Sequence, residues 1–278
     1  MKKISRRSFM AAAAVSVAAL AMTACGGSAS SAASSVASSA ASSEAVSSAA
    51  AADLTTVEAG KLTMATNATF PPYEMTTDSG EIEGIDVDTA KAIAEKLGLE
   101  LQIDDMDFDA ALLSVQQGKA DIVMAGVTVT DERKAVMDFS DSYATGIQSI
   151  IVPNDSEIAT PDDLAGKKIG TQRGTTGYIY CSDDFGEDSV VAYDNGLTAV
   201  QALNNGQVDA VVIDNAPATE YVAANPGLKV LDTSYAEEDY AIGMAKGSAL
   251  EDAVNKALEE LKADGTLQAI VDKYINAN

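Results

Sequence analysis

A set of groups that suits carboxylate binding follows a short apolar stretch near the middle of the chain. Residues 122–125 are apolar without a helical period, which predicts a buried strand. At Gly126 no Cβ hinders the approach of a ligand to the backbone. Thr128 then offers a hydroxyl, and Arg133 offers a guanidinium that binds both oxygens of a carboxylate. This spacing favours a small-carboxylate site with a free N–H at Gly126. The alternative is a helix capped by Thr130, with Arg133 in a surface ion pair.

A second candidate anion site lies at residues 174–177, where two glycines flank two threonines. The segment follows a predicted strand and opens a helix, so the N–H groups of Thr175 and Thr176 lie at the positive end of the helix dipole. Asp214 follows an apolar strand at 210–213 and offers a carboxylate to an ammonium group. The alternatives are helix capping by a threonine in the loop and by Asp214.

The composition excludes whole classes of chemistry. The 278-residue chain contains no His, which excludes histidine catalysis and a histidine metal site, and we expect neither a metal ion nor a cofactor. A formal net charge of -24 predicts a body that repels nucleic acid and anionic lipid. Cys181 has no partner in the mature body, so we expect no disulfide. Because no His is present to activate it, we interpret Cys181 as a buried thiol rather than a nucleophile.

Residues 1–24 have the features of an export signal. A basic start precedes an apolar stretch at 9–24 that is too short and too rich in alanine for a good membrane span. Small residues before Cys25 and glycines after it resemble a bacterial lipoprotein cleavage site, at which Cys25 becomes the lipidated first residue. A pair of arginines near the start also resembles a twin-arginine signal, so this route and general secretion both stay open. Residues 25–53 are rich in Ser and Ala and predict a flexible tether at the outer face of the cytoplasmic membrane.

Folded sequence begins near Leu54 and alternates between strand and helix patterns. Apolar residues at helical spacing predict a helix that follows Gly84 and ends at Gly98. Alternating strands and helices argue for a mostly parallel sheet with helices on both faces. The first half is expected to hold strands at 61–66, 99–103 and 121–125, a loop with two prolines at 67–74, and a second helix at 108–117.

The second half of the chain repeats the layout of the first. In residues 116–123 and again in 204–211 a helix ends on a glycine and an Asp precedes an apolar strand. We therefore predict two α/β lobes. Extended crossings at 147–152 and 240–245 connect them as a hinge, followed by amphipathic helices at 250–261 and 267–275. A ligand site is expected in the cleft between the lobes.

The strand ends of the first lobe bring further side chains to this cleft. Carboxyl ends of strands face the cleft in open α/β sheets, which places Asn67, Phe70 and Phe108 there. Together with carboxylate-binding groups from both lobes and an acid for an ammonium, the two phenylalanines describe a site for a free α-amino acid.

The body from about residue 54 to 278 resembles the bacterial extracellular solute-binding proteins for polar amino acids that serve ABC importers. The resemblance is carried by 84–88, with Ile85 in place of a commoner Phe, and by two ligand loops at 128–133 and 172–176. It implies a two-lobed periplasmic-binding-protein-like fold of type II, with two mixed sheets joined by a two-strand hinge. The first lobe is expected at 54–147 plus 240–278 and the second at 148–239.

The resemblance also implies a role for each site residue. Arg133, Thr128 and the N–H groups near Gly126 and Thr175–Thr176 hold the α-carboxylate, while Asp214 holds the α-ammonium. Phe70 and Phe108 sandwich the ligand side chain, and Asn67 and Gln172 contact its tip. Both of these tip-reading residues are neutral, whereas relatives that bind histidine or lysine often have Asp in place of Asn67. We therefore expect a polar uncharged amino acid first and a cationic one second.

The expected protein is a monomeric extracytoplasmic lipoprotein, anchored through Cys25, that hands its amino acid to the permease subunits of an ABC importer. Two alternatives stay open. One is a dehydratase-like enzyme on the same fold, with Glu74 and other cleft acids as acid/base groups, although the absence of His leaves few such groups. The other is a sensor subunit that presents its ligand to a separate receptor.

Overall fold

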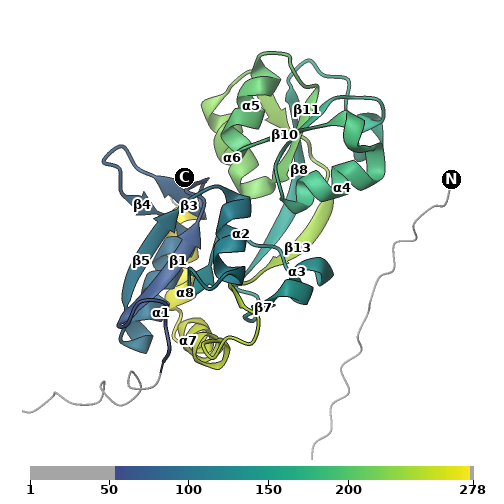
Figure 1. The fold of residues 1–278 in the computed structure, drawn as a ribbon. Coiled ribbons are helices and arrows are strands. Elements are labelled where there is room, and N and C mark those ends of the chain that lie inside the picture. The colour runs from purple at the N-terminus through teal and green to yellow at the C-terminus, as the bar shows by residue number, and fades with distance from the viewer. Residues whose placement is uncertain (1–53, 276–278) are drawn as a thin grey trace, which may run out of the picture. The chain divides into compact units, whose positions relative to one another are not determined.

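Alternating strands and helices build two large sheets in the computed structural model, which describes residues 54–275 (Figure 1). These residues all fall within one compact unit. The predicted signal segment, the lipidation site Cys25 and the tether at 25–53 lie outside the described residues, as do residues 276–278. Within 54–275 no helix combines the length and the apolar character that a bilayer crossing needs.

The first sheet has the strand order β5-β1-β6-β14-β7. β1 pairs in parallel with β5 and β6, whereas β14 runs antiparallel to β6 and β7, so the sheet is mixed. Side chains alternate between its faces: Met64 packs in the cluster that contains α1, and Ala65 packs in the cluster that contains α2. We call this sheet and its helices the first lobe. Its elements are β1 (Lys61–Thr66), α1 (Ile85–Leu97), β5 (Glu100–Asp105), α2 (Phe108–Gln116), β6 (Ile122–Val123), α3 (Asp131–Val136), β7 (Met137–Phe139), β14 (Gly243–Ala245), α7 (Glu251–Ala263) and α8 (Thr266–Ile275).

The second sheet has the order β10-β9-β11-β8-β12, with β13 paired to β8. It is also mixed, because β9 is parallel to β10 and β11 while β8 is antiparallel to its partners. α4 covers one face and α5 and α6 the other. We call this set the second lobe. It contains β8 (Ala144–Pro153), β9 (Ile169–Gln172), α4 (Thr176–Phe185), β10 (Val190–Tyr193), α5 (Gly196–Asn204), β11 (Ala210–Asp214), α6 (Asn215–Ala224), β12 (Leu228–Val230) and β13 (Ala236–Tyr240), with short 3-10 turns η1 (Pro161–Leu164) and η2 (Glu187–Ser189). The predicted two-lobed α/β fold with two mixed sheets is confirmed.

The predicted internal repeat is visible at the level of single hydrogen bonds. Each half has a helix followed by a glycine with positive φ, at Gly118 (65°) and Gly206 (67°). In each half an aspartate then ties its strand to the neighbouring strand: Asp121 accepts from the backbone N–H of Thr63 at 2.7 Å, and Asp209 accepts from that of Lys168 at 2.8 Å. The two halves therefore use the same local device to set the register of a parallel strand pair.

Helix predictions in the first lobe are confirmed almost to the residue. α1 buries Val87, Ala90, Ile93, Ala94 and Leu97, the positions with helical spacing, and Gly98 ends it in the left-handed conformation (φ 69°). α2, α7 and α8 also begin and end within two residues of the expected bounds.

Two strand predictions and one loop prediction need correction. The strand expected at 121–125 has only two paired residues, because the chain bends at Gly126 (φ 55°). The loop expected at 67–74 instead contains β2 (Thr69–Phe70) and the start of β3 (Glu74–Thr76), which form a small sheet with β4 (Ile82–Glu83). The single return crossing at 240–245 is two strands, β13 and β14. Residues 241 and 242 interrupt it, since their N–H groups bond Val127 O and Ser140 Oγ.

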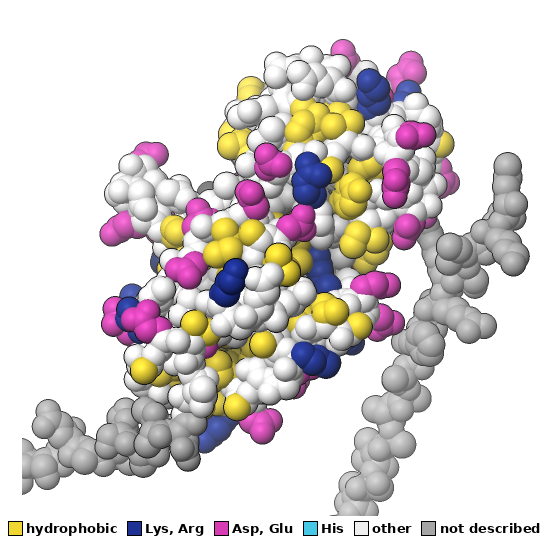
Figure 2. Space-filling model, in the orientation of Figure 1, with side chains coloured by type: hydrophobic (Ala, Val, Ile, Leu, Met, Phe, Trp, Pro, Cys, Tyr) yellow, Lys and Arg dark blue, Asp and Glu magenta, His cyan; other side chains and the backbone are white. Residues whose placement is uncertain are grey.

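Two connections link the lobes, and they lie side by side. β8 and β13 pair antiparallel from Ala144↔Tyr240 to Gln148↔Ala236, and β13 then leads into β14 of the first sheet. Figure 1 shows these strands running from one lobe to the other. Figure 2 shows acidic side chains spread over both lobes on the same face, in keeping with the net charge of -24.

Candidate functional site

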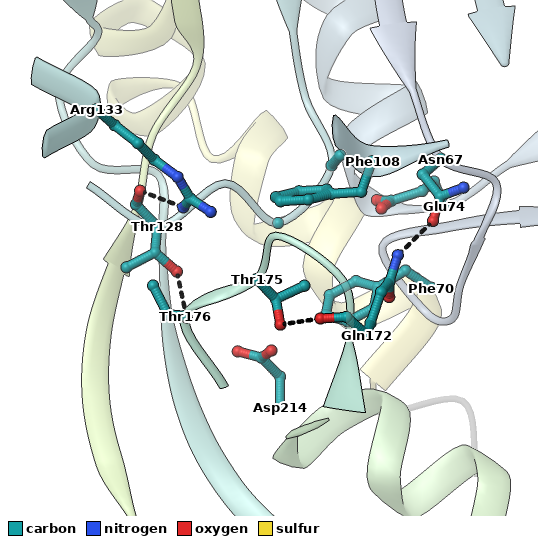
Figure 3. A pocket seen from close by; sticks show the side chains of 12 residues that line it. Asn67, Phe70, Glu74, Phe108, Thr128, Arg133, Gln172, Thr175, Thr176 and Asp214 are labelled. Atoms are coloured by element: carbon teal, nitrogen blue, oxygen red, sulfur yellow. Dashed lines mark hydrogen bonds between the residues drawn. The ribbon is translucent and has the colours of Figure 1, made fainter. Parts of the chain in front are cut away.

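One pocket between the lobes is lined by all ten residues that the sequence analysis assigned to the ligand (Figure 3). Its lining is Asn67, Phe70, Glu74, Phe108, Ala125, Gly126, Thr128, Arg133, Gln172, Thr175, Thr176 and Asp214, so Glu74 and Ala125 are the additions. The cavity has a volume of only ≈ 20 Å³. This is room for water rather than for an amino acid, so the walls must separate to admit one.

Arg133 is buried at the pocket, 8 % exposed. Its Nη1 donates to the carbonyl oxygen of Thr128 at 2.8 Å, and its Nη2 donates across the cleft to that of Gly174 at 3.1 Å. The guanidinium also lies 5.3 Å from the centre of the Phe108 ring. Burial lowers its pKa, and the nearby charge of Glu238 opposes that shift. Thr130 does cap α3, but Arg133 makes no ion pair among the described residues, so the surface ion-pair alternative is wrong.

The backbone N–H of Gly126 is not free, contrary to the expectation. It donates to Asp86 Oδ2 at 3.0 Å, while Oδ1 of the same carboxylate accepts from the Tyr143 hydroxyl at 2.7 Å. A glycine is favoured here by its positive φ of 55°, and also because a Cβ would lie 2.7 Å from the ring of Phe70. Gly126 therefore lets Phe70 pack against the bend, and Asp86 fixes that bend from behind.

The second loop places the start of α4 against the pocket. Thr175 caps this helix, since its Oγ1 accepts from the N–H of Tyr178 at 3.3 Å while donating to Gln172 O at 2.8 Å. The capping alternative for this loop is thus confirmed. Gly174 approaches the first lobe so closely that a Cβ would overlap the carboxylate of Asp109 on α2. The described structure is accordingly a closed arrangement, in which the loop contacts both lobes.

Asp214 ends β11 with its carboxylate buried, 7 % exposed. It occupies the N-cap position of α6 but makes no side-chain cap bond, so its capping alternative is wrong. Instead the hydroxyl of Tyr240 donates to Oδ1. Burial raises the pKa of Asp214 to about 7, and the hydrogen bonds from Tyr240 and Gln148 oppose that rise. A positive charge placed beside Asp214 would therefore stabilise its ionised form.

Asn67 and Gln172 meet across the cleft at one side of the pocket. Gln172 Nε2 donates to Asn67 Oδ1 at 2.9 Å, and Asn67 Nδ2 donates to the carbonyl of Met106 at 2.9 Å. Phe70 and Phe108 lie beside this pair and are each 6 % exposed. This side of the pocket therefore presents neutral polar groups next to two aromatic rings.

Thr128 and Thr176 face one another from opposite lobes, with their hydroxyl oxygens 3.5 Å apart. Both hydroxyls bond the carboxylate of Glu238 on β13, a residue that the sequence analysis did not select. One signal for it exists in the sequence: residues 236–240 alternate, and the even positions Glu238 and Tyr240 are the buried ones. An acid at an inward position of a strand is a candidate for a specific partner.

Glu74, like Glu238, is an acid to which the sequence analysis gave no role in ligand binding. It is fully buried, lines the pocket, and neither of its oxygens meets a donor at hydrogen-bond geometry. Burial, with Asp86 close by, raises its pKa well above the usual range, while burial raises the pKa of Asp86 to about 6. No group of three or more acids or cysteines among residues 54–275 has the arrangement of a metal site. Cys181 is buried and unpaired, as expected, and burial raises its pKa to about 12.

Comparison with known proteins gives one consistent result. Residues 62–277 match the family described as bacterial extracellular solute-binding proteins, family 3. The L-cystine-binding protein TcyJ of Escherichia coli is 34% identical over 225 residues, which cover 80% of this chain and 85% of that protein. Among solved structures, the arginine-, lysine-, histidine-binding protein ArtJ of Geobacillus stearothermophilus is 35% identical with a TM-score of 0.75, covering 78% of this chain and 96% of that one. An ancestral arginine-binding protein bound to glutamine is 43% identical with a TM-score of 0.73, covering 78% and 98%.

Proposed function

Because the chain belongs to the bacterial extracellular solute-binding proteins of family 3, we propose that it captures a free polar L-amino acid between its two lobes and delivers it to an ABC-type importer. It is a binding protein rather than an enzyme, as its relatives are. The observation that carries the choice of ligand is the pairing of a buried cation and a buried anion in one small pocket. Arg133 and Asp214 are both at least nine-tenths buried there. A zwitterion satisfies both charges at once.

We assign the α-carboxylate of the ligand to Arg133. The guanidinium reaches into the closed cleft from the first lobe, and the N-terminus of α4 faces the same space from the second, with Thr175 and Thr176 at its start. A charge-assisted pair inside a dry cleft is stronger than the same pair at the surface. The α-ammonium then lies by Asp214, whose burial without a cation raises its pKa.

We assign the side chain of the ligand to the space between Phe70 and Phe108, with its tip at Asn67 and Gln172. Their amide pair offers both donors and acceptors, and a ligand that replaces their mutual hydrogen bond has to be polar. A polar uncharged amino acid satisfies these groups without an unpaired charge, and it is our first choice. A cationic amino acid is the second, favoured by Glu74 in the lining and by the arginine-binding relatives.

We further propose that the protein works as a monomer tethered to the outer face of the cytoplasmic membrane through a lipid on Cys25. The support is in the sequence: small residues before the cysteine, glycines after it, and a long Ser/Ala-rich segment before the folded body. The tether lets the lobes reach permease subunits while the anchor holds the protein nearby. β8 and β13 are the proposed hinge.

A thermal-shift screen tests this function. The purified protein is heated with each of the twenty amino acids, with cystine and with ornithine. A ligand at 100 times its Kd adds about 2.7 kcal/mol to the stability of the folded state, so its melting temperature rises by several degrees. We expect a small set of polar amino acids to produce this shift. The absence of a shift with every amino acid would overturn the proposed function.

A further inference from the structure

Glu238 lies beside the pocket and collects three hydrogen bonds on one carboxylate oxygen. Its Oε2 accepts from Thr128 Oγ1 at 3.1 Å, from Thr176 Oγ1 at 3.0 Å and from Gln148 Nε2 at 3.0 Å. The residue is 6 % exposed, and its charge also acts on Arg133. Glu238 does not line the pocket itself, so any effect on a ligand passes through these neighbours.

The three donors come from three different parts of the fold. Thr128 follows β6 in the first lobe, Thr176 opens α4 in the second lobe, and Gln148 lies on β8, one of the two connections between them. Glu238 itself lies on β13, the other connection. The complete set of bonds therefore exists only when the lobes are close enough to bring both threonines to the same oxygen.

These bonds fix the direction of the two hydroxyl protons. In both bonds the threonine hydroxyl is the donor and Glu238 Oε2 the acceptor, so the single hydroxyl hydrogen of each threonine points at Glu238. The oxygens of Thr128 and Thr176 then have only lone pairs left for the pocket that both residues line. Such oxygens accept from an ammonium and cannot donate to a carboxylate. The Thr128 hydroxyl, which the resemblance assigned to the α-carboxylate, is therefore reassigned to the ammonium, and Thr176 has only its backbone N–H for the carboxylate. Glu238 thus determines which end of a zwitterion these two side chains recognise.

We propose that Glu238 is a positioning residue of the ligand site. On closure it accepts hydrogen bonds from the hydroxyls of Thr128 and Thr176, one from each lobe, and so leaves both hydroxyl oxygens as acceptors for the ligand's ammonium. This inference rests on the proposed function and adds a source of specificity to it. Ligands with an α-amino group gain two acceptors only in the closed form, so recognition of the amine and closure are one event. A 2-hydroxy acid of the same shape has no positive charge to offer these oxygens.

The test compares amino acids with their 2-hydroxy analogues in the variant Glu238→Gln. The glutamine amide donates as well as accepts, so a threonine hydroxyl is free to turn its proton toward the pocket. Calorimetry with L-glutamine, L-arginine and the 2-hydroxy analogue of each gives the ratio of affinities. We expect the ratio of amino acid to hydroxy acid to fall by about tenfold or more, a difference of about 1.4 kcal/mol. Glu237→Gln is the matched control, because it removes the same charge from the next residue of β13, whose side chain is exposed. Its ratio should equal that of the wild type.

A second variant keeps the proposal testable if Glu238→Gln does not fold. Thr176→Val removes one of the two hydroxyls and should lower the same ratio, while Thr176→Ser should restore it. Where both single variants fold, the double variant should show less than the sum of the two effects, since Glu238 acts through Thr176.

The outcomes separate this inference from the proposed function. If the wild type binds no amino acid in the screen, the proposed function fails. If the wild type binds and Glu238→Gln leaves the ratio within about threefold of the wild type, or if the effects of Glu238→Gln and Thr176→Val simply add, the positioning role is overturned and the proposed function stands.

Discussion

The hydroxyl of Tyr240 donates a hydrogen bond to the carboxylate of Asp214, which joins the pocket to one of the two connections between the lobes. Tyr240 is fully buried, and its ring packs edge-on against Tyr73 at a centroid distance of 5.3 Å. Gly146 on the other connecting strand leaves the space for that ring, because a Cβ there would lie 2.4 Å from it. Asp214, the proposed ammonium-binding acid, is thus held by Tyr240 on β13, and movement of the proposed hinge would displace it.

Tyr240→Phe should make binding more sensitive to acid. The bond from Tyr240 holds down the pKa of Asp214, which is about 7, so its removal raises that pKa further. Asp214 must be ionised to pair with an ammonium, and affinity should begin to fall at a higher pH in the variant. Hydrogen bonds to charged groups contribute about 1.5–3 kcal/mol, so we expect binding at pH 7 to weaken ~10-fold or more. Titration calorimetry from pH 5.5 to 9 measures both effects, with Tyr193→Phe on β10 as the control. Superimposable pH profiles would show that Tyr240 does not tune Asp214.

Asp214→Asn should stabilise the ligand-free protein while abolishing tight binding. The folded-state pKa of about 7 lies above that of an unfolded aspartate, ~3.9. The stability associated with this group is therefore greatest below the unfolded value, and it is lost as pH rises through 4 to 7. Asparagine avoids that loss, and at pH 8 we expect a gain of about 1–4 kcal/mol. Urea unfolding at pH 4 and pH 8 measures it. A variant less stable than the wild type at pH 8 would contradict the assignment.

Arg133→Ala should leave a buried ligand carboxylate without its partner. Truncating one side of a buried charge pair costs about 2–5 kcal/mol, which corresponds to ~30-fold to several-thousand-fold in affinity. Arg133→Lys should recover only part of the loss, since an ammonium lacks the two-pronged geometry. Arg173→Ala is a control, because this exposed arginine directly follows the pocket residue Gln172 but does not line the pocket. Its guanidinium lies 3.9 Å from a carboxylate oxygen of Asp194 and 3.5 Å from the carbonyl oxygen of Ala192. Affinity within about threefold of the wild type for Arg133→Ala would remove Arg133 from the site.

Asn67→Asp should shift preference toward arginine and lysine. The new carboxylate still accepts the bond from Gln172, so the contact across the cleft survives while a negative charge is added at the ligand tip. We expect cationic amino acids to gain about tenfold relative to uncharged ones, a change of ~1.4 kcal/mol. Competition binding over the amino-acid panel gives the rank order, and Asn205→Asp adds the same charge on the surface. An unchanged rank order would place the ligand tip elsewhere.

Cys25→Ser should release the protein from membranes without changing its affinity. The residue lies outside the described structure, and the Ser/Ala-rich segment separates it from the folded body. Fractionation of cells expressing wild type and variant, followed by ligand titration of both, checks the two parts. Retention of the variant in membranes after a high-salt wash would refute the lipid anchor.

Local patterns in the sequence predicted most helices and strands. Because the strands place the residues at their ends, these patterns also predicted which residues line the pocket. Strand β1 and helix α1 follow from periodicity and from Gly98, and residues at strand ends reach the pocket because parallel strands end on one edge. The contacts that organise the pocket join residues far apart in the chain. Asp86 reaches Gly126 forty residues on, and Glu238 reaches Thr128 from 110 residues away. No local pattern specifies such pairs, so the bond at Gly126 and the contacts of Glu238 required the structure.

Strand order has a consequence for how the chain matures. β14 lies between β6 and β7, although more than a hundred residues separate it from either in sequence. Under general secretion, one of the two export routes that the sequence leaves open, the chain crosses the membrane with its N-terminus first. β8 to β13 can then assemble as an uninterrupted stretch, whereas the first sheet cannot be completed until β14, near the end of the chain, has crossed. Until then β6 presents an unpaired edge, the kind of surface on which export chaperones act and on which aggregation begins. Vectorial folding should therefore complete the second lobe first, and truncation before Gly243 should leave a translocated chain with half its binding cleft unformed.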